Sequence, residues 1–278
     1  VSGSSGIYAC AAAGFGLDCS FIGKVGSDPF SQLALSAIAS RGVRTDAVVH
    51  SDSGQLGLAF LEYLPSGRNY TYYRDGSVGS QLRPEELPEA AFTGASILHL
   101  PGMLLELNDS MRQSCFRAVE LAKQNHVLFS FDPNLRKELR NDAQMRQRMM
   151  QMLSMADVIE PTLDEARIIT GCTEISDVLR ALHAAGPRLV VLTRDKDGAL
   201  FSFDGQILSA EGIDVPVVDP TGAGDTFAAA LACCIEENMQ MEDAISFCNC
   251  AGTLVCTKRG AIGMAIPTRA QVLDMMRM

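Results

Sequence analysis

Apolar residues recur along this chain at two spacings, and together they predict an alternation of helices and strands. Stretches with apolar residues three and four positions apart have the spacing of one helix face, and they cover Ile7–Phe15, Pro29–Arg41, Ser110–Gln124 and Ala143–Met155. Shorter apolar runs have the length and composition of buried strands. We predict strands at Cys19–Gly23, Ser96–Leu100, Val127–Phe131, Asp157–Glu160, Leu189–Thr193 and Val215–Val218.

Residues 45–75 have a different pattern, because no helical stretch interrupts them. Ala47–His50, Leu56–Leu64 and Asn69–Tyr73 read as strands, and Pro65-Ser66-Gly67 has the composition of a hairpin turn. We therefore expect a small β-sheet appended to the rest of the chain.

After residue 75 the pattern is repeated βα alternation, which is typical of a parallel sheet covered by helices on both faces. Ala199–Phe203 and Gln206–Ala210 flank Asp204-Gly205 and predict a hairpin. Helices are expected near 223–238 and 242–257. The predicted fold class is α/β, a doubly wound and mostly parallel sheet built from residues 1–44 and 76–278, with the small β-sheet of residues 45–75.

Composition narrows the choice of partners. The 278 residues are 47% hydrophobic, which is ample for one large core, and the net charge is −10 from 23 basic and 33 acidic residues. Without a run of Lys and Arg we expect no nucleic-acid partner, and without a long apolar run no membrane partner. The nine scattered cysteines contain no CxxC pair, so we expect reduced thiols in a cytoplasmic protein.

The strongest local signal is the segment Asp219–Asp225, which lies between a predicted strand and an Ala-rich helix. A glycine-containing turn at the start of a helix leaves backbone N–H groups available to an anion. The amides of Gly222, Ala223 and Gly224 therefore suit a phosphate, and the Asp225 carboxylate beside them can accept a proton from an attacking hydroxyl. Taken singly, Asp225 is also an ordinary helix-start acid and the glycines ordinary turn formers; the seven-residue unit favours phosphoryl transfer.

This segment, followed by Thr226-Phe227, resembles the C-terminal signature of the ribokinase-like (PfkB-type) carbohydrate kinases. Gly14–Phe30 is similar to the N-terminal signature of the same family, and no GxxxxGK[ST] of a P-loop enzyme is present. The resemblance covers essentially the whole chain. It implies a doubly wound core, a lid formed by residues 45–75, ATP as phosphoryl donor, and Mg²⁺.

The resemblance also assigns roles to individual residues. It implies that Asp225 is the catalytic base and that Gly222, Ala223 and Gly224 form the anion hole. Asp219, Thr221 and the backbone of residues 255–260 match a site for a monovalent cation such as K⁺. Glu165 matches a residue associated with Mg²⁺ and phosphate. The remaining matches are to the nucleotide and acceptor sites, and they are Thr193, Gly198, Asn249 and Gly3; for Asn249, a hydrogen bond within its own helix is the alternative.

Two segments bear on the acceptor. Tyr72–Ser77 and Asp132–Arg136 are similar to segments of 2-keto-3-deoxygluconate kinases, and the second also occurs in fructokinases. Arg74 and Arg136 together can clamp a carboxylate by two-point hydrogen bonding, or lie at a sheet edge and in a capping network. Tyr72 either packs on the sugar or faces away from it. We expect a sugar-acid kinase, with a neutral-sugar kinase such as fructokinase and a non-catalytic sensor protein as alternatives.

Some positions depart from the family pattern. Ile7 and Thr162 stand where Asn is usual, and Asp195 where Gly is usual. Relative to the family, the sequence starts about 30 residues late, and we expect those residues to precede Val1, because losing a central strand exposes core and unpaired backbone. By analogy with the family, a homodimer through the lid is expected, on apolar lid positions Leu58, Phe60 and Tyr63.

Overall fold

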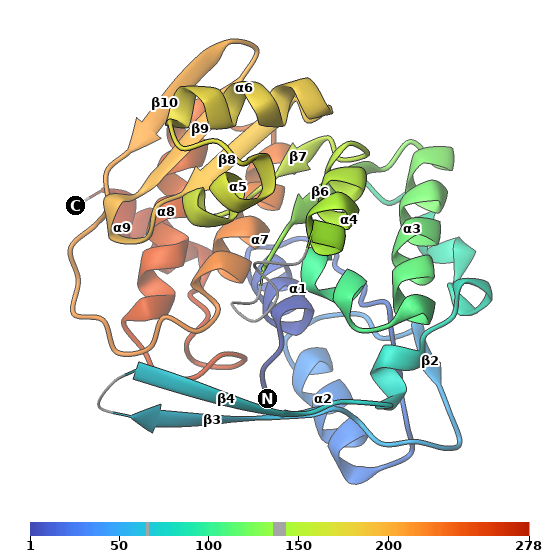
Figure 1. Cartoon of the computed structure of the whole chain (residues 1–278). Helices are drawn as coiled ribbons and strands as arrows, with labels where there is room; N and C mark the ends of the chain where they lie inside the picture. Colours follow the sequence, from blue (N-terminus) through green and yellow to red (C-terminus); the bar gives the residue numbers. More distant parts are fainter. Residues whose placement is uncertain (65–66, 136–142, 278) are drawn as a thin grey trace.

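The computed structural model describes residues 1–64, 67–135 and 143–277, in which helices and strands alternate as expected (Figure 1). The α-helices are α1 Ser4–Gly14, α2 Pro29–Ala39, α3 Asp109–Gln124, α4 Ala143–Leu153, α5 Leu163–Thr170, α6 Ile175–Ala185, α7 Ala223–Glu236, α8 Met241–Cys256 and α9 Arg269–Met276. The strands are β1 Gly23–Val25, β2 Val48–His50, β3 Leu58–Leu64, β4 Gly67–Tyr73, β5 Ile97–Pro101, β6 Leu128–Asp132, β7 Val158–Ile159, β8 Leu189–Thr193, β9 Ala199–Phe203 and β10 Gln206–Ala210.

The main sheet has the strand order β10-β9-β8-β7-β6-β5. Strands β5 to β8 are parallel to their neighbours, and β9 and β10 add an antiparallel hairpin at one edge. The predicted α/β fold class is therefore confirmed, including the hairpin at its predicted residues. Parallel strands present their carboxyl ends at one edge, where ligands of such sheets bind.

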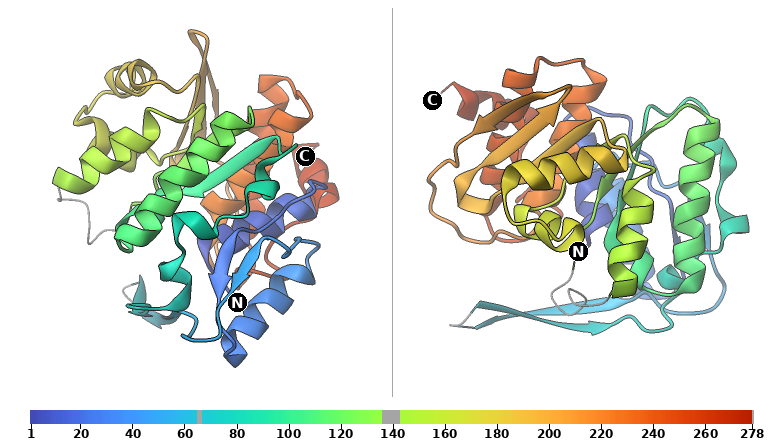
Figure 2. Two further views of the ribbon diagram at one scale, coloured as in Figure 1. Left: turned by 90° about the vertical axis from the view of Figure 1, so that its right-hand side faces the viewer. Right: turned by 45° about the horizontal axis from the view of Figure 1, so that its top comes forward.

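Helices cover both faces of this sheet. Helices α3, α4, α5 and α6 pack on one face, and α1, α7 and α8 pack on the other (Figures 1 and 2). Strand β8 shows why the sequence requires two layers: Val190 and Leu192 point into the first core cluster, and Val191 between them points into the second. A run of buried apolar residues is thus shared between two hydrophobic cores.

Side-chain caps determine where several helices begin. Asp28 precedes Pro29 at the start of α2, and its carboxylate accepts hydrogen bonds from the N–H groups of Phe30 and Ser31. At α5, Thr162 and Glu165 form a capping box, each side chain accepting from the other residue's backbone. The second cap bears on function because Glu165 lies at the carboxyl edge of the sheet.

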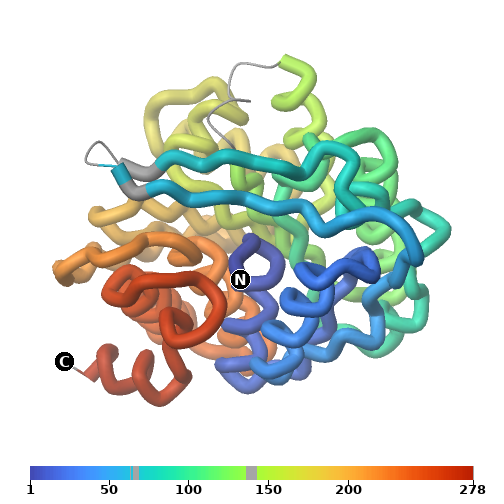
Figure 3. The backbone as a smooth tube through the Cα atoms, turned by 90° about the horizontal axis from the view of Figure 1, so that it is seen from below, coloured from blue at the N-terminus to red at the C-terminus, as the bar shows by residue number. Residues whose placement is uncertain are grey.

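Strands β3 and β4 form a separate antiparallel hairpin that runs past the N-terminus of the chain (Figure 3). The prediction that Ala47–His50 belongs to this small sheet is wrong, since β2 pairs with β1 instead. Asp28 ties the base of the hairpin to α2, because its Oδ2 also accepts a hydrogen bond from the N–H of Leu56 at 3.1 Å. The predicted turn residues 65 and 66 lie outside the described residues.

Two other predicted strands are corrected by the structure. The strand expected at Cys19–Gly23 begins only at Gly23, and before it only Ser20 makes an isolated bridge, to Arg44. Val215–Val218 is not a strand: the N–H of Val218 bonds to the carbonyl of Cys256 at the end of α8, and no neighbouring strand pairs with it.

The nine cysteines all lie in the described part of the chain, and none of them forms a disulfide. None of the helices described is both long and apolar enough to cross a bilayer.

Candidate active site

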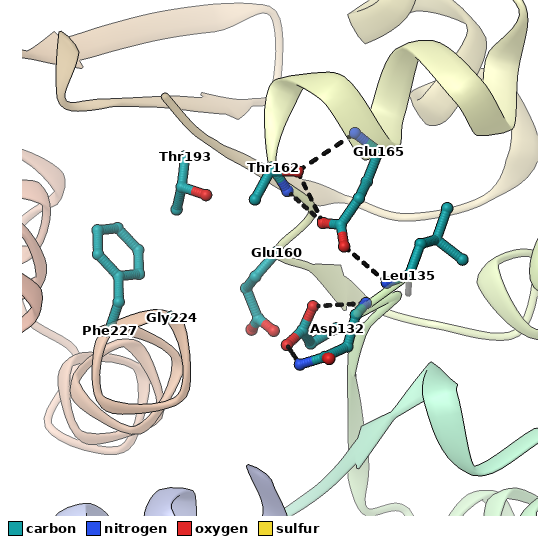
Figure 4. Close-up of a pocket in the computed structure, with 9 residues that line it drawn as sticks. Asp132, Leu135, Glu160, Thr162, Glu165, Thr193, Gly224 and Phe227 are labelled. Atoms are coloured by element: carbon teal, nitrogen blue, oxygen red, sulfur yellow. Dashed lines mark hydrogen bonds between the residues drawn. The ribbon is translucent and has the colours of Figure 1, made fainter. Parts of the chain in front are cut away.

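The carboxyl ends of three parallel strands converge on one pocket. Asp132 ends β6, Glu160 follows β7 and Thr193 ends β8. They line a cavity of about 160 Å³ together with Asn134, Leu135, Thr162, Glu165, Gly224 and Phe227 (Figure 4). The pocket therefore lies between the carboxyl edge of the sheet and the first turn of α7, the place expected for a ligand of a doubly wound fold.

Glu165 is held rigidly in this wall. Its Oε2 accepts hydrogen bonds from the N–H and the hydroxyl of Thr162, at 2.8 and 2.9 Å, and its Oε1 accepts from the N–H of Leu135 at 2.6 Å. Thr162, which stands where the family usually has Asn, thus performs the capping that fixes Glu165. Glu165 and Gly224 both line the pocket.

Asp132 and Asn134 form the loop after β6. The carboxylate of Asp132 accepts from the N–H of Asn134 at 3.0 Å and from its side-chain amide at 3.1 Å, and Asn134 has a left-handed φ of 44°. Burial raises the pKa of Asp132 well above its usual value, and the nearby charges of Glu165 and Asp225 raise it further. The pocket therefore gathers carboxyl groups that disfavour one another's ionisation.

Glu160 belongs to a buried polar chain behind the pocket. Ser130 donates to Glu160 Oε1 at 2.9 Å, and His99 Nδ1 lies 2.8 Å from the Ser130 hydroxyl. His99 and the Ser130 hydroxyl thus form the next link of this chain behind Glu160. Tyr8 stacks on the imidazole at 3.8 Å. Burial raises the pKa of Glu160 to about 8 and lowers the pKa of His99 to about 3.

The second carboxylate oxygen of Glu160 is one of three buried side-chain atoms without a hydrogen bond among the described residues, with Arg194 Nε and Thr226 Oγ1. Glu160 is only 6% exposed, and its Oε2 has no hydrogen-bond partner among the described residues. An unpaired carboxylate charge is costly in such a place, and the raised pKa of Glu160 reflects that cost. The side chain lines the pocket, so a bound ligand can reach it.

The turn before α7 has the geometry of an anion site. Gly222 precedes the helix with a φ of 88°, and a side chain there would meet Ile7 Cγ2 at 3.0 Å. Ile7, which replaces the usual Asn, therefore packs directly against this turn. A side chain at Gly224 would meet nothing within 4 Å. The N–H of Ala223 donates to the carbonyl of Pro220 at 3.3 Å, a long bond that an anion could replace, and the helix dipole adds positive potential at this end of α7.

Asp225 lies in that first turn, where the sequence placed it. Its Oδ1 accepts a short hydrogen bond from the hydroxyl of Ser4, the first residue of α1. The side-chain amide of Asn134 in turn donates to Ser4 Oγ at 3.4 Å. The candidate base is thus linked through Ser4 to the loop after β6.

Asp219 organises the segment before the turn. Its Oδ1 accepts from the N–H and the hydroxyl of Thr221 at 3.0 and 2.7 Å, and its Oδ2 accepts from the N–H of Gly260 at 3.3 Å. The backbone carbonyl of Cys256 accepts from the N–H of Asp219. The structure therefore brings Asp219, Thr221, Cys256 and Gly260 together.

The predicted nucleotide residues form two groups. Thr193 lines the pocket, and its backbone bridges to Thr162. Gly198 and Asn249 lie away from the pocket wall, beside the segment after β10. Gly198 has a φ of 85° and its position allows no side chain, since one would meet the carbonyl of Ala210 at 2.0 Å. The side-chain amide of Asn249 donates to the carbonyl of Glu211 at 2.7 Å, not within its own helix.

The predicted acceptor residues are only partly placed. Gly3 precedes α1 next to Ser4, with a φ of 132°. On the hairpin, the Arg74 guanidinium lies over the ring of Tyr72 at 4.4 Å, and neither residue lines the pocket. Arg136 lies outside the described residues, so the clamp of Arg74 and Arg136 is not observed.

Sequence reasoning missed three contributors to the site: Ser4, Glu160 and His99. Ser4 and Asp225 are 221 positions apart, and no local pattern connects them. Glu160 appeared only as the last residue of a predicted strand. A single signal was available, since an acid at the carboxyl end of a buried parallel strand faces the ligand edge of the sheet.

This chain is similar to known proteins over nearly its whole length. The pattern of the "pfkB family carbohydrate kinase" matches residues 8–269. Fructokinase-1 of Oryza sativa subsp. japonica is 30% identical over 289 residues, covering 99% of this chain and 87% of the relative. The structure of a fructokinase from Vibrio cholerae O395 in a fructose, ADP and calcium ion bound form has a TM-score of 0.88 and 26% identity, over 98% of this chain and 90% of that chain.

A double mutant of the same Vibrio cholerae O395 enzyme, in a fructose, ADP and potassium ion bound form, has a TM-score of 0.87 and 26% identity, over 98% of this chain and 89% of that chain. The α/β fold, the glycine-containing turn before α7 and these similarities agree. The chain belongs to the pfkB family of carbohydrate kinases.

Proposed function

We propose that this protein phosphorylates a hydroxyl of a neutral sugar, with fructose as the favoured acceptor and ATP as the donor. This proposal replaces the expected sugar-acid kinase with the alternative, a neutral-sugar kinase. The observation that carries the choice is the similarity to fructokinases over nearly the whole chain, at 28–30% identity. The chemistry of the pocket points the same way.

An acidic acceptor fits poorly beside this pocket. Asp132, Glu160 and Glu165 line it, and the charge of Asp225 acts on Asp132. A carboxylate brought here would be repelled by the charges of Glu165 and Asp225, which already raise the pKa of Asp132. The hydroxyls of a neutral sugar can instead donate to the carboxylates.

We assign the proton transfer to Asp225. Its carboxylate takes the proton as the acceptor hydroxyl attacks, while the N–H groups around Gly222 and Gly224 stabilise the negative charge that develops on the transferred group. The geometry that supports this assignment is local: base and anion site share the first turn of α7.

The residues present fit the two cofactors of such a reaction. ATP supplies the phosphoryl group, and the open space over Gly224 lets a phosphate approach the backbone. Among the described residues, no three His, Cys, Asp or Glu side chains are grouped as metal ligands. We therefore propose that Mg²⁺ is held by phosphates and water, beside the rigid carboxylate of Glu165. Asp219 and Thr221 remain the proposed site for K⁺.

An acceptor panel tests the function. With ATP and Mg²⁺, we expect kcat/KM for fructose to exceed that for 2-keto-3-deoxygluconate by at least about tenfold, the effect of roughly 1.4 kcal/mol in the transition state. ADP release coupled to NADH oxidation measures both. A preference for the acid would reverse the proposal, and absence of ADP release with every acceptor would support the non-catalytic alternative.

Arg74→Ala serves as the matched variant of this panel. Because the guanidinium lies over Tyr72, we expect the substitution to lower kcat/KM by a similar factor for both acceptors. A loss confined to the acidic acceptor would show that Arg74 binds a carboxylate, as the carboxylate-clamp hypothesis requires.

We also propose that the hairpin mediates a homodimer. One face of it carries Phe60 and Tyr73, which pack edge to face at 5.7 Å and are 58% and 66% exposed. Leu58 on the same face is half-buried, and the side chain of Tyr63 lies outside the described residues. A two-stranded hairpin with exposed aromatic residues is only marginally stable alone, and a second copy of the hairpin would cover them.

Sedimentation tests the dimer. We expect the wild-type protein to sediment as a dimer at micromolar concentration and Phe60→Asp as a monomer, since the charge would be buried at the interface. Ile207→Asp is the control, because Ile207 is equally exposed, at 57%, on edge strand β10. A monomeric wild type, or a monomeric Ile207→Asp, would contradict this interface.

A further inference from the structure

Ser4 makes a contact that no sequence pattern indicates. Its hydroxyl donates to Asp225 Oδ1, joining the first residue of α1 to the first turn of α7. The two helices pack side by side in the second core, with Ile7 and Phe227 among the buried residues (Figure 1). Both ends of the contact therefore lie on rigid elements.

The direction of this hydrogen bond is determined by a third residue. The Asn134 side-chain amide donates to Ser4 Oγ at 3.4 Å and to Asp132 Oδ2 at 3.1 Å. Because Ser4 has a single hydroxyl hydrogen and accepts from Asn134, that hydrogen is left for the carboxylate of Asp225. A hydrogen bond to a carboxylate is among the stronger kinds, and partial burial strengthens it.

Capping of helix α1 does not explain the contacts of the Ser4 hydroxyl. The capping position of α1 is Gly3, which makes no side-chain capping bond. The hydroxyl of Ser4 is engaged by two side chains of the site, Asp225 and Asn134, and not by the backbone of its own helix. Its contacts thus point into the site.

We propose that Ser4 is a positioning residue, which holds the carboxylate of Asp225 in the orientation needed to receive the acceptor proton and couples it to the loop of Asp132 and Asn134. The inference rests on the proposed function and adds a residue to its site. Orientation matters because a base that must first rotate into place spends binding energy on ordering itself.

Kinetics of Ser4→Ala, Ser4→Thr and Ser5→Ala test the proposal. Ser5 is the matched control, since it is the next residue of the same helical turn. We expect Ser4→Ala to lower kcat by about 10- to 100-fold with little change in KM for the sugar, the size of one lost charged hydrogen bond. Ser4→Thr, which keeps a hydroxyl, should recover most of kcat, and Ser5→Ala should behave as the wild type.

The outcomes separate the two proposals. If the wild type phosphorylates a sugar and Ser4→Ala is equally fast, or if Ser4→Thr is as slow as Ser4→Ala, the positioning role is overturned while the function stands. If the wild type phosphorylates no acceptor, the proposed function fails, and crystal structures of wild type and Ser4→Ala decide the role of Ser4. An unchanged Asp225 carboxylate orientation in Ser4→Ala would then overturn it.

Discussion

Asp225→Asn is expected to lower the turnover of this kinase by about 10²- to 10⁴-fold, the usual contribution of a positioned general base. The carboxamide has nearly the shape of the carboxylate, and its oxygen can still accept the hydrogen bond from Ser4. It cannot take a proton from the acceptor. The loss should therefore appear in kcat, with KM for ATP and sugar nearly unchanged. Steady-state ADP release with saturating ATP measures it.

Two controls accompany this result. The melting temperature of Asp225→Asn should stay close to that of the wild type, because the exchange keeps the first turn of α7 and its packing. Nucleotide binding measured by calorimetry should persist as well. Turnover of Asp225→Asn equal to that of the wild type would remove Asp225 from the role of base and would leave only the anion site of the turn.

Much of the fold could be predicted from local sequence patterns, because each correctly predicted helix or strand has the residue pattern typical of its type. The hairpin of β9 and β10 flanks the turn residues Asp204-Gly205, and both strands begin and end at the predicted residues. Val215–Val218 has the composition of a strand, yet Val217 and Val218 are 65% and 51% exposed and their segment finds no partner strand. Whether a strand finds a partner depends on the tertiary structure, which β-propensity alone does not predict.

The candidate site likewise has a part that could be predicted from the sequence and a part that could not. The turn from Asp219 to Asp225 is contiguous, so its glycines, its helix start and its acid could be read together. The contacts of Asp225 with Ser4, and of Glu165 with Leu135, join parts of the chain that are far apart in sequence or in different elements. Buried polar groups are satisfied by whatever the fold brings near them, and a sequence shows the donors without their distances.

Glu160 is another residue whose surroundings the sequence does not show. The second large expected effect is that the folded protein loses stability between pH 6 and pH 9 because of this side chain. The pKa of Glu160 is raised from the usual 4.5 to about 8, first because it is buried. The folded state thus keeps a proton that the unfolded state has lost. Stability from this proton is full below about pH 4.5 and falls as pH rises, until Glu160 ionises in the folded state near pH 8.

The surroundings of Glu160 explain why its ionisation is unfavourable. Burial disfavours the charged form, and the hydrogen bond that Ser130 donates to Oε1 offsets only part of that effect. His99 is kept neutral by burial, which lowers its pKa to about 3, so it brings no compensating charge. No described side chain bonds Oε2. The total effect is on the order of a few kcal/mol, since each pKa unit corresponds to about 1.4 kcal/mol.

Urea unfolding of the wild type and of Glu160→Gln at pH 6 and pH 9 measures this difference. The glutamine keeps the acceptor for Ser130 and cannot ionise, so we expect Glu160→Gln to lose less stability than the wild type on going to pH 9. Titrating groups that do not interact with Glu160 are common to both proteins and cancel in the comparison. Glu174→Gln, at an exposed helix start without a side-chain capping bond, should follow the wild type. Equal losses in the wild type and Glu160→Gln would mean that the buried carboxyl does not hold its proton, and that the pocket carries a full negative charge there at neutral pH.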